Sequence, residues 1–220
     1  MNEYLEDMLV RMAYHSSGIE GNTISLPQTV SIILEGTLPG ENKSIREFYE
    51  IENHKQTFDY MLAQLDSKQP LSLDIILNIH TLLTDRLQHD RGKFKSNQNA
   101  IRGAEFQTAT PQETPMLMRQ WIDNLNYRLD QYNTVDEFYG ILADTHIQLE
   151  RIHPFSDGNG RTGRMIMMYL SLKYQKVPVI ISKDNRARYI ELLAEQNTDE
   201  LKNILESSYE FEKERIQQFS

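Results

Sequence analysis

The chain has 220 residues, 39% of them hydrophobic and 25% charged, which fits one globular domain better than two. Its formal net charge of −9 argues against a role in binding nucleic acid or a membrane surface. Because the chain lacks cysteine, carries acidic residues near its start and has no run of roughly 18 apolar residues, we expect a cytoplasmic protein without disulfides, signal peptide or membrane span.

The hydrophobic periodicity is helical along almost the whole chain. It predicts helices near 2–17, 27–35, 45–65, 72–88, 114–130, 135–150, 161–174, 185–195 and 198–217. Capping pairs support three of these starts, namely Ser44 with Glu47, Thr134 with Glu137 and Asn197 with Glu200. The sequence therefore predicts an all-α fold.

One stretch, 92–111, lacks the helical period. Its segments 99–101 and 105–108 flank Arg102-Gly103-Ala104, which predicts a short β-hairpin with Gly103 in the turn. The chain shows no internal repeat and no long linker. A single helical domain with a hairpin flap is the simplest architecture.

The run from His153 to Arg164 (HPFSDGNGRTGR) collects residue types that a packed core does not need together. Gly158 and Gly160 allow a close approach of anionic oxygens, and a helix beginning near 159–161 adds backbone N–H donors and a favourable dipole. Arg161 and Arg164 are three positions apart, so both can face one phosphate chain.

Two further residues of this run suit phosphate chemistry. Asp157 can hold Mg²⁺ against phosphate oxygens, and His153 can accept a proton from an incoming hydroxyl.

Two similar motifs do not match this run. A P-loop requires Lys-Ser/Thr where Arg164-Met165 stands, and a calcium EF-hand requires Gly where Thr162 stands and Glu where Met168 stands.

The run 153–164 resembles the signature of Fic-domain proteins, His-x-Phe-x-Asp/Glu-Gly-Asn-Gly-Arg-x-x-Arg, at every fixed position. Residues 92–95 and the predicted hairpin resemble the flap of that family. The resemblance implies a single all-α Fic-type domain over 1–220. Within it, 1–25 would be an inhibitory helix region, 92–111 the flap hairpin, 153–164 the catalytic loop and 198–217 the C-terminal helix.

The resemblance also implies an activity, the transfer of AMP from ATP to a Ser, Thr or Tyr hydroxyl of a target protein (AMPylation). His153 would be the catalytic base and Asp157 the ligand of Mg²⁺. The nucleotide would be bound by Gly158, Asn159, Gly160, Arg161, Thr162, Gly163 and Arg164, with Tyr189 and Asn197 near the adenosine. The flap residues Ala100, Ile101, Arg102 and Gly103 would pair with an extended target segment. Tyr189 is equally explained as a core residue, and Asn197 as the cap of the last helix.

The run Ser16-Ser17-Gly18-Ile19-Glu20-Gly21 resembles the inhibitory motif of the family. In the class with an N-terminal inhibitory helix, Glu20 would pair with Arg164 and deprive the γ-phosphate of its partner. Ser16 would hold that helix by a hydrogen bond. The alternative is a helix that ends at one of the glycines and leaves Glu20 in solvent.

The same loop residues are compatible with other activities. Within the enzyme class these are removal of AMP, with Glu20 positioning a water, and transfer of another nucleotide or of phosphocholine. A non-enzymatic ATP-sensing module would need neither His153 nor Asp157. The expected partners are ATP and a protein target, which can be the chain itself, without nucleic acid or membrane. The target and a homodimer stay open.

Overall fold

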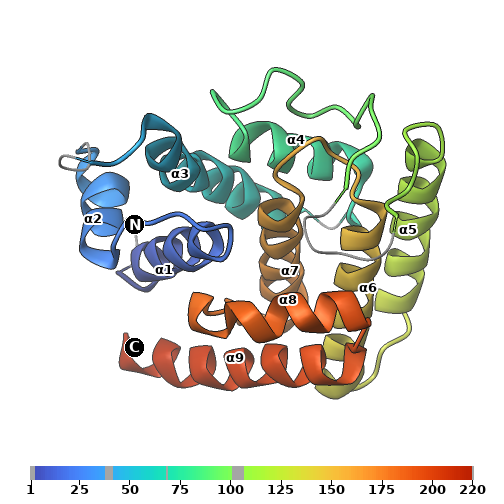
Figure 1. Ribbon diagram of the computed structural model, residues 1–220. Helices are drawn as coiled ribbons and strands as arrows, with labels where there is room; N and C mark the ends of the chain where they lie inside the picture. Colours follow the sequence, from blue (N-terminus) through green and yellow to red (C-terminus); the bar gives the residue numbers. More distant parts are fainter. Residues whose placement is uncertain (1–2, 38–41, 68, 101–106, 220) are drawn as a thin grey trace.

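The computed structural model describes residues 3–37, 42–67, 69–100 and 107–219, and in these ranges it consists of helices and connecting loops (Figure 1). The helices are α1 (Glu3–Ile19), α2 (Leu26–Val30), the π-helical turn η1 (Ser31–Glu35), α3 (Ile45–Leu65), α4 (Leu73–Leu83), α5 (Thr114–Leu129), α6 (Val135–Ile152), α7 (Asn159–Gln175), the short 3₁₀ helix η2 (Lys183–Asn185), α8 (Arg186–Glu195) and α9 (Thr198–Gln218). Every predicted helix is present, so the all-α class is confirmed.

The predicted capping sequences begin three of these helices. Ser44 Oγ accepts the Glu47 N–H at 3.1 Å, and the Glu47 carboxylate accepts the Ser44 N–H in return at 3.1 Å, which completes a capping box. Asn197 Oδ1 accepts the Glu200 N–H at 3.1 Å and so caps α9. Thr134 likewise caps α6.

Helix α4 ends at Leu83, five residues before the predicted end. The side chain of Asn53 on α3 donates to the carbonyls of Leu83 at 3.1 Å and of Asp85 at 2.7 Å. Arg86 then adopts a left-handed backbone with φ 59°. The early end is therefore stabilised by a neighbouring helix, which no local sequence pattern reports.

The predicted hairpin flap is not shown. Residues 99–100 and 107–108, the described parts of its two arms, contain no strand, and 101–106 lie outside the described residues. The arms are joined through side chains instead, because Thr108 Oγ1 donates to the Asn99 carbonyl at 2.8 Å and Gln98 Nε2 donates to the Thr108 carbonyl at 3.1 Å.

Helices α6 and α7 form the centre of the bundle. Helix α7 is apolar on all sides from Met165 to Leu170, and none of these residues is more than 2% exposed. It packs against α6, α4, α3 and α1, while α6 also packs against α5 and α9. The loop between α6 and α7 therefore lies at one end of the core next to α4 (Figure 1), and Arg46 at the start of α3 reaches Asp157 in it.

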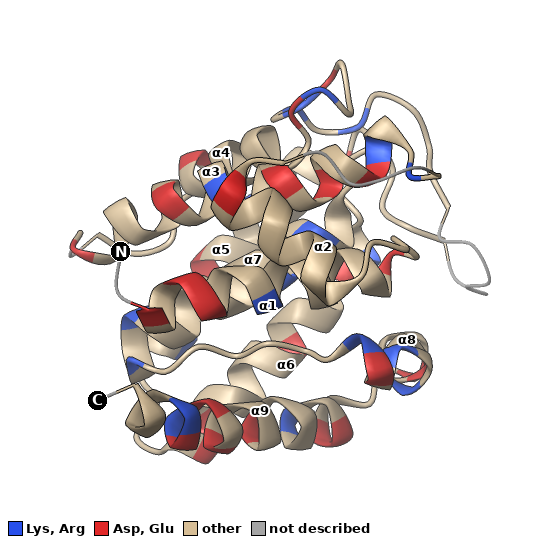
Figure 2. Ribbon diagram, turned by 90° about the vertical axis from the view of Figure 1, so that its left-hand side faces the viewer, with Lys and Arg blue, Asp and Glu red and all other residues tan. Residues whose placement is uncertain are grey.

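An extended segment, 177–182, runs between α1 and α9 (Figure 2). The Ile180 N–H donates to Ser208 Oγ of α9 at 2.8 Å, and the Lys183 N–H donates to His15 Nδ1 of α1 at 3.3 Å. Within the described residues, no helix has both the length and the apolar character needed to cross a membrane.

Candidate active site

The loop between α6 and α7 begins and ends with left-handed backbone. His153 has φ 49° and ψ 60° and ends α6 by donating its N–H to the Leu149 carbonyl at 2.9 Å. Gly158 has φ 81° and precedes α7, and a Cβ there would lie 2.8 Å from Thr84 Cγ2. Glycine is therefore required at 158 both for its conformation and for space.

Asn159 closes this loop on itself. Its Oδ1 accepts the Phe155 N–H and its Nδ2 donates to the Phe155 carbonyl, both at 2.9 Å. Because both functional atoms of the Asn159 side chain are used in this way, the residue shapes the loop. The sequence had predicted only a contribution to anion binding.

A buried histidine on α4, which the sequence did not single out, packs against the loop and hydrogen-bonds to its backbone. His80 on α4 stacks on the Phe155 ring, with centroids 3.7 Å apart. The Gly92 N–H donates to His80 Nδ1 at 2.9 Å, so His80 Nε2 carries the proton and donates to the Asp157 carbonyl at 2.9 Å. Burial lowers the pKa of His80 to about 4, so the ring is neutral and structural.

His153 is oriented so that Nδ1 faces α6. That atom lies 3.3 Å from the Glu150 carbonyl and 3.7 Å from the Glu150 carboxylate. A proton on Nδ1, donated to the carbonyl, leaves Nε2 with a free lone pair. Burial lowers the pKa of His153 to about 4, so the imidazole is neutral near pH 7 and can accept a proton.

Asp157 is ionised and accessible. Its Oδ2 accepts hydrogen bonds from Arg46 at 2.7 Å and Gln88 at 2.8 Å, and its Oδ1 accepts the Gly158 N–H at 2.6 Å. Burial raises the pKa of this carboxyl, but Arg161 and the hydrogen bond from Arg46 outweigh burial and hold the pKa below its ordinary value. The side chain is 39% exposed.

The oxygen donor of Asp157 fits Mg²⁺, which is usually bound by one or two carboxylates together with water and substrate phosphates. Among the residues that the structure describes, no cluster of three or more His, Cys, Asp or Glu side chains could hold a metal without such help. The site therefore fits a metal that arrives with a phosphate ligand.

Arg161 is a buried cation with unused donors. It is 2% exposed, its Nη2 lies 3.7 Å from Asp157 Oδ1, and its Nε and Nη1 have no hydrogen-bond partner among the described residues. A buried guanidinium normally has partners, because desolvating a charge costs free energy. Two unpartnered N–H donors at the start of α7 indicate a place for an anion.

Arg164, one turn further along α7, is held by hydrogen bonds to the end of α1. Its Nη2 donates to Glu20 Oε1 at 2.5 Å and to the Ser16 carbonyl at 3.0 Å, and its Nε donates to Ser16 Oγ at 3.1 Å. Arg164 is 4% exposed. Burial raises the pKa of Glu20, but Arg164 outweighs burial, so the net shift is downward and the carboxylate is ionised.

The Glu20 carboxylate also lies over the loop. A Cβ added at Gly160 would be 2.4 Å from Glu20 Oε1, which places the carboxylate directly against the backbone of α7's first turn. The Glu20 side chain is 40% exposed, but its carboxylate is paired with Arg164 and is not free in solvent. Helix α1 ends at Ile19, directly before the glutamate that pairs with Arg164. Gly21, with φ 98°, then turns the chain away.

Residues that the sequence analysis missed hold this end of α1 on α3. Asn22 Nδ2 donates to the Glu47 carbonyl at 2.9 Å and to Glu50 Oε2 at 3.0 Å, and Ser17 Oγ donates to the Glu50 carbonyl at 3.0 Å. The Asn22 and Ser17 side chains thus hold the segment on which Glu20 stands. They are polar residues near a helix end, and no local pattern distinguishes them from ordinary caps.

The remaining predicted residues occupy different places. Tyr189 is 1% exposed, hydrogen-bonds to His146 Nε2 at 2.6 Å and lies under the Arg164 guanidinium, 5.9 Å from ring centroid to Cζ. Gly163 faces α6, because a Cβ there would be 2.6 Å from His146 Cε1. Thr162 is fully buried, and no partner for its hydroxyl is found in the described ranges.

Asn197 caps α9, and its side chain bonds to Glu200 within the same helix. Ala100 is exposed, and Ile101, Arg102 and Gly103 lie outside the described residues. The proposed roles of these residues toward nucleotide or target stay predictions.

The base of the flap is attached to the loop. Lys95 is 3% exposed; its N–H donates to the Pro154 carbonyl at 2.9 Å and its Nζ donates to the Ile152 carbonyl at 3.1 Å. Asn99 Nδ2 donates to the Phe155 carbonyl at 2.8 Å. The described base of the flap segment, at Lys95 and Asn99, thus lies beside His153.

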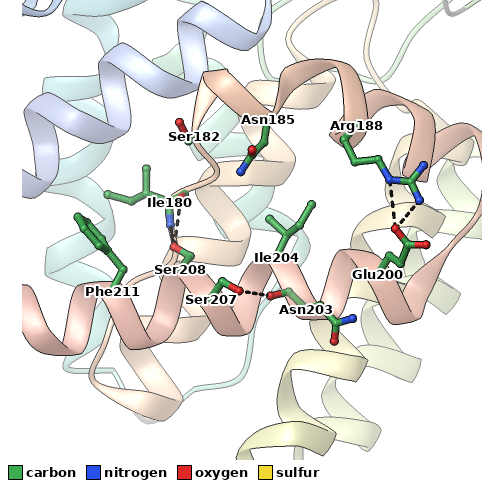
Figure 3. A pocket seen from close by; sticks show the side chains of 10 residues that line it. All are labelled: Ile180, Ser182, Asn185, Arg188, Glu200, Asn203, Ile204, Ser207, Ser208 and Phe211. Atoms are coloured by element: carbon green, nitrogen blue, oxygen red, sulfur yellow. Dashed lines mark hydrogen bonds and ion pairs between the residues drawn. The ribbon is translucent and has the colours of Figure 1, made fainter.

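A separate hollow of about 430 Å³ lies between segment 180–188 and α9 (Figure 3). Arg188 and Glu200 bridge one end of it with an ion pair, and Ile180, Ile204 and Phe211 supply its apolar part. No residue of the loop or of the inhibitory segment lines this hollow. It is therefore not part of the candidate active site.

The fold and the loop define a Fic-type domain, and comparison with known proteins agrees. Residues 70–171 match the Fic/DOC family, so this part of the chain is a Fic domain. The "Protein adenylyltransferase Fic" of Drosophila willistoni is 35% identical over 190 residues, 86% of this chain and 37% of that protein. The protein of the same name in Drosophila mojavensis is 36% identical over 191 residues, with the same shares. The chain thus spans a little over a third of the length of these curated relatives.

Solved structures give the same family. A Fic domain containing signaling protein from Bacteroides thetaiotaomicron superimposes with a TM-score of 0.78 at 26% identity, covering 86% of this chain and 72% of that one. Fic-1 from C. elegans also gives 0.78 at 26% identity, covering 97% of this chain and 62% of that one.

Proposed function

We propose that this chain is a protein adenylyltransferase that moves AMP from ATP to a Ser, Thr or Tyr hydroxyl of a target protein. The observation that carries the proposal is Arg161, a buried guanidinium whose Nε and Nη1 find no partner in the described ranges, beside a neutral His153 and an ionised Asp157. A phosphate chain across the start of α7 supplies the missing acceptors.

The chemical step follows from the orientation of His153. Its Nε2 takes the proton of the target hydroxyl, whose oxygen attacks the α-phosphorus. The bond from that phosphorus to the oxygen bridging to the β-phosphate breaks, and pyrophosphate leaves. Arg161 and the first N–H groups of α7 neutralise the phosphate charge. Mg²⁺ held by Asp157 would supply further charge neutralisation.

The protein target would be held by the flap. Residues 100–103 would pair through their backbone with an extended segment of the target, which brings its hydroxyl next to His153. The attachment of Lys95 and Asn99 to the loop supports this placement. The "Protein adenylyltransferase Fic" relatives support the choice of AMP as the transferred group.

We further propose that the chain as described is autoinhibited. Glu20 occupies Arg164 at 2.5 Å, and an ionised carboxylate beside Gly160 repels a third phosphate. ATP would then bind with its γ-phosphate displaced and its α-phosphate out of line. Displacing Glu20 frees Arg164 for the γ-phosphate and allows transfer.

Intact-mass measurement tests this function. Wild type, Glu20→Gly and Glu20→Gly with His153→Ala are incubated with ATP and magnesium, alone and with cytosolic extract. We expect an added AMP on Glu20→Gly or on a protein of the extract, much less with wild type and none with the double variant. Nucleotide binding without any covalent product in all three would overturn the proposal in favour of an ATP-sensing module.

A second candidate, removal of AMP, rests on the position of Glu20. An ionised carboxylate over the loop can orient a water toward an AMP–protein bond. In that case wild type, and not Glu20→Gly, releases AMP from a protein that Glu20→Gly has modified. Incubating the modified protein with each variant separates the two activities.

A further inference from the structure

Glu150 on α6 is a buried carboxyl that the proposed transfer step does not use. It is 7% exposed. Its Oε2 lies 3.7 Å from His153 Nδ1 and its Oε1 lies 4.0 Å from His146 Nε2, and Oε1 has no hydrogen-bond partner among the described residues. A buried polar atom without a partner costs stability, so its presence beside the candidate base requires an explanation.

Several titratable and charged groups face this carboxyl from the packed elements. On α6 these are His146 and His153. Across the interface Gly163 lets α7 approach, since a Cβ there would be 3.2 Å from Glu150 Oε1, and the charge of Arg164 acts on the carboxyl. Beyond Arg164 lie Glu20 from the end of α1 and Tyr189 from α8. Glu150 therefore stands between the arginine that the switch holds and the histidine that would do the chemistry.

We propose that ionised Glu150 is a positioning residue that keeps His153 Nδ1 turned toward α6 and stabilises the imidazolium that forms when Nε2 accepts the target's proton. This inference rests on the proposed function. The proton passes from the target hydroxyl to Nε2, the Nδ1 proton stays on the ring, and Glu150 takes up no proton. A negative charge 3.7 Å away in a poorly solvated site has a large effect on the charged ring and a small one on the neutral ring.

The surroundings make the ionisation of Glu150 sensitive to the switch. Burial raises the pKa of Glu150 to about 7, Arg164 acts to lower it, and Glu20 acts to raise it. Removing Glu20 takes away a negative charge and leaves Arg164 without its partner, so the pKa of Glu150 falls and the carboxyl ionises at neutral pH. Displacement of Glu20 would then free Arg164 at one end of the loop and ionise Glu150 beside His153 at the other.

Histidine NMR tests this coupling without any need for activity. The ring signals of His153, assigned with His153→Ala, are followed against pH in Glu20→Gly and in Glu20→Gly with Glu150→Gln. We expect two steps in Glu20→Gly, the upper one below pH 7 and coincident with the ionisation of Glu150. Only the lower step should remain with glutamine, which is the same size and carries no charge. A His153 signal that titrates identically in both variants overturns the inference, even if AMP transfer is confirmed.

The rate of AMP transfer gives the second readout. In Glu20→Gly the turnover number should rise with pH through the ionisation of Glu150. With Glu150→Gln it should fall about tenfold at pH 8 and lose that rise, with the affinity for ATP unchanged, since one pKa unit corresponds to a factor of ten. Glu150→Asp, which keeps the charge, should keep the rise. Weaker ATP binding with an unchanged pH profile would assign Glu150 to supporting Arg164 and overturn the inference.

Glu212→Gln in the same Glu20→Gly background is the matched control. Glu212 is also a buried carboxylate, 1% exposed, but it lies on α9 and bonds to Arg11 and Tyr4. Its loss should leave both the His153 titration and the pH–rate profile in place. A change of the same kind with Glu212→Gln would show that any lost buried charge acts on the site, and would overturn the specific role of Glu150.

Discussion

The two ends of the loop 153–164 differ in how far their functional side chains are exposed to solvent, although hydrogen bonds hold the side chains at both ends. At its beginning, His153 and Asp157 are held by Glu150, Arg46 and Gln88, yet Asp157 is 39% exposed and open to a ligand. At its end, Arg164 is 4% exposed and donates hydrogen bonds to Glu20 and Ser16 of the N-terminal segment. The accessible side chain thus lies at the beginning of the loop, whereas the arginine at its end is already paired within the chain.

Under the proposed function, this difference would let the single carboxylate of Glu20 act as a switch. Arg164 is buried, so a partner other than Glu20 must replace both the charge and the hydrogen bonds that the glutamate supplies. A γ-phosphate would do both. In the proposed mechanism, inhibition and productive binding would therefore compete for one guanidinium.

The largest expected effect comes from the beginning of the loop, where His153 lies. Removing the imidazole with His153→Ala in the Glu20→Gly background should lower the rate of AMP transfer by about 10²- to 10⁴-fold, the usual contribution of a general base. The rate is measured from intact mass against time. His89→Ala, at an exposed histidine, should leave the rate unchanged. Equal rates for His153→Ala and His89→Ala would remove His153 from the mechanism.

The second largest effect on the rate comes from the end of the loop, where Glu20 pairs with Arg164. Glu20→Gln removes the charge but keeps the length of the side chain, and it should raise AMP transfer roughly 5- to 150-fold, the usual range of a regulatory coupling. Glu214→Gln, an exposed glutamate on α9, serves as the control. If both substitutions leave the rate at the wild-type value, Glu20 is not the switch.

Glu150 connects the two ends, and its effect should appear in stability against pH. Its pKa is raised to about 7, so the folded state holds a proton that the unfolded chain releases near 4.5. Stability is therefore lost as the pH rises through this window, by at most about 3 kcal/mol. Glu150→Gln should reduce the fall in unfolding free energy between pH 5 and pH 8, measured by urea denaturation. An unchanged difference would mean that the carboxyl titrates normally.

The smallest effect should come from Ser16. Ser16→Ala removes the hydroxyl that accepts from Arg164 Nε at 3.1 Å but leaves the Glu20 ion pair in place. Losing one such bond is worth about 0.5–1.5 kcal/mol, so AMP transfer should rise roughly 2- to 10-fold. Ser207→Ala, at an exposed serine on α9, should have no effect. A fall in rate with Ser16→Ala would show that Ser16 supports the active state instead.

The parts of the site that were predictable from sequence share a local origin. The loop is a contiguous run of residues. The helix starts at Ser44 and Asn197 follow from capping pairs whose two residues are three positions apart. The pair of Glu20 and Arg164 lies 144 positions apart and was expected only through resemblance to the Fic family.

The parts that were not predictable depend on contacts between distant helices. His80 reaches Asp157 across 77 positions and Arg46 reaches it across 111, and neither residue carries a local signal of that role. The same holds for the early end of α4, which Asn53 of α3 stabilises. The flap hairpin was expected from the flanking pattern, but Lys95 and Asn99 bond to the loop and the described arms form no strand.

Nucleotide affinity tests most directly whether Glu20 occupies the place of the γ-phosphate. Calorimetry would give the Kd of ATP and of ADP for wild type, Glu20→Gly, and Glu20→Gly with Arg164→Ala. The ratio of the two Kd values should be near one in wild type, rise to about ten or more in favour of ATP in Glu20→Gly, and return toward one without Arg164, since a desolvated charge pair is worth at least a factor of ten. A ratio that is the same in all three proteins would contradict the account.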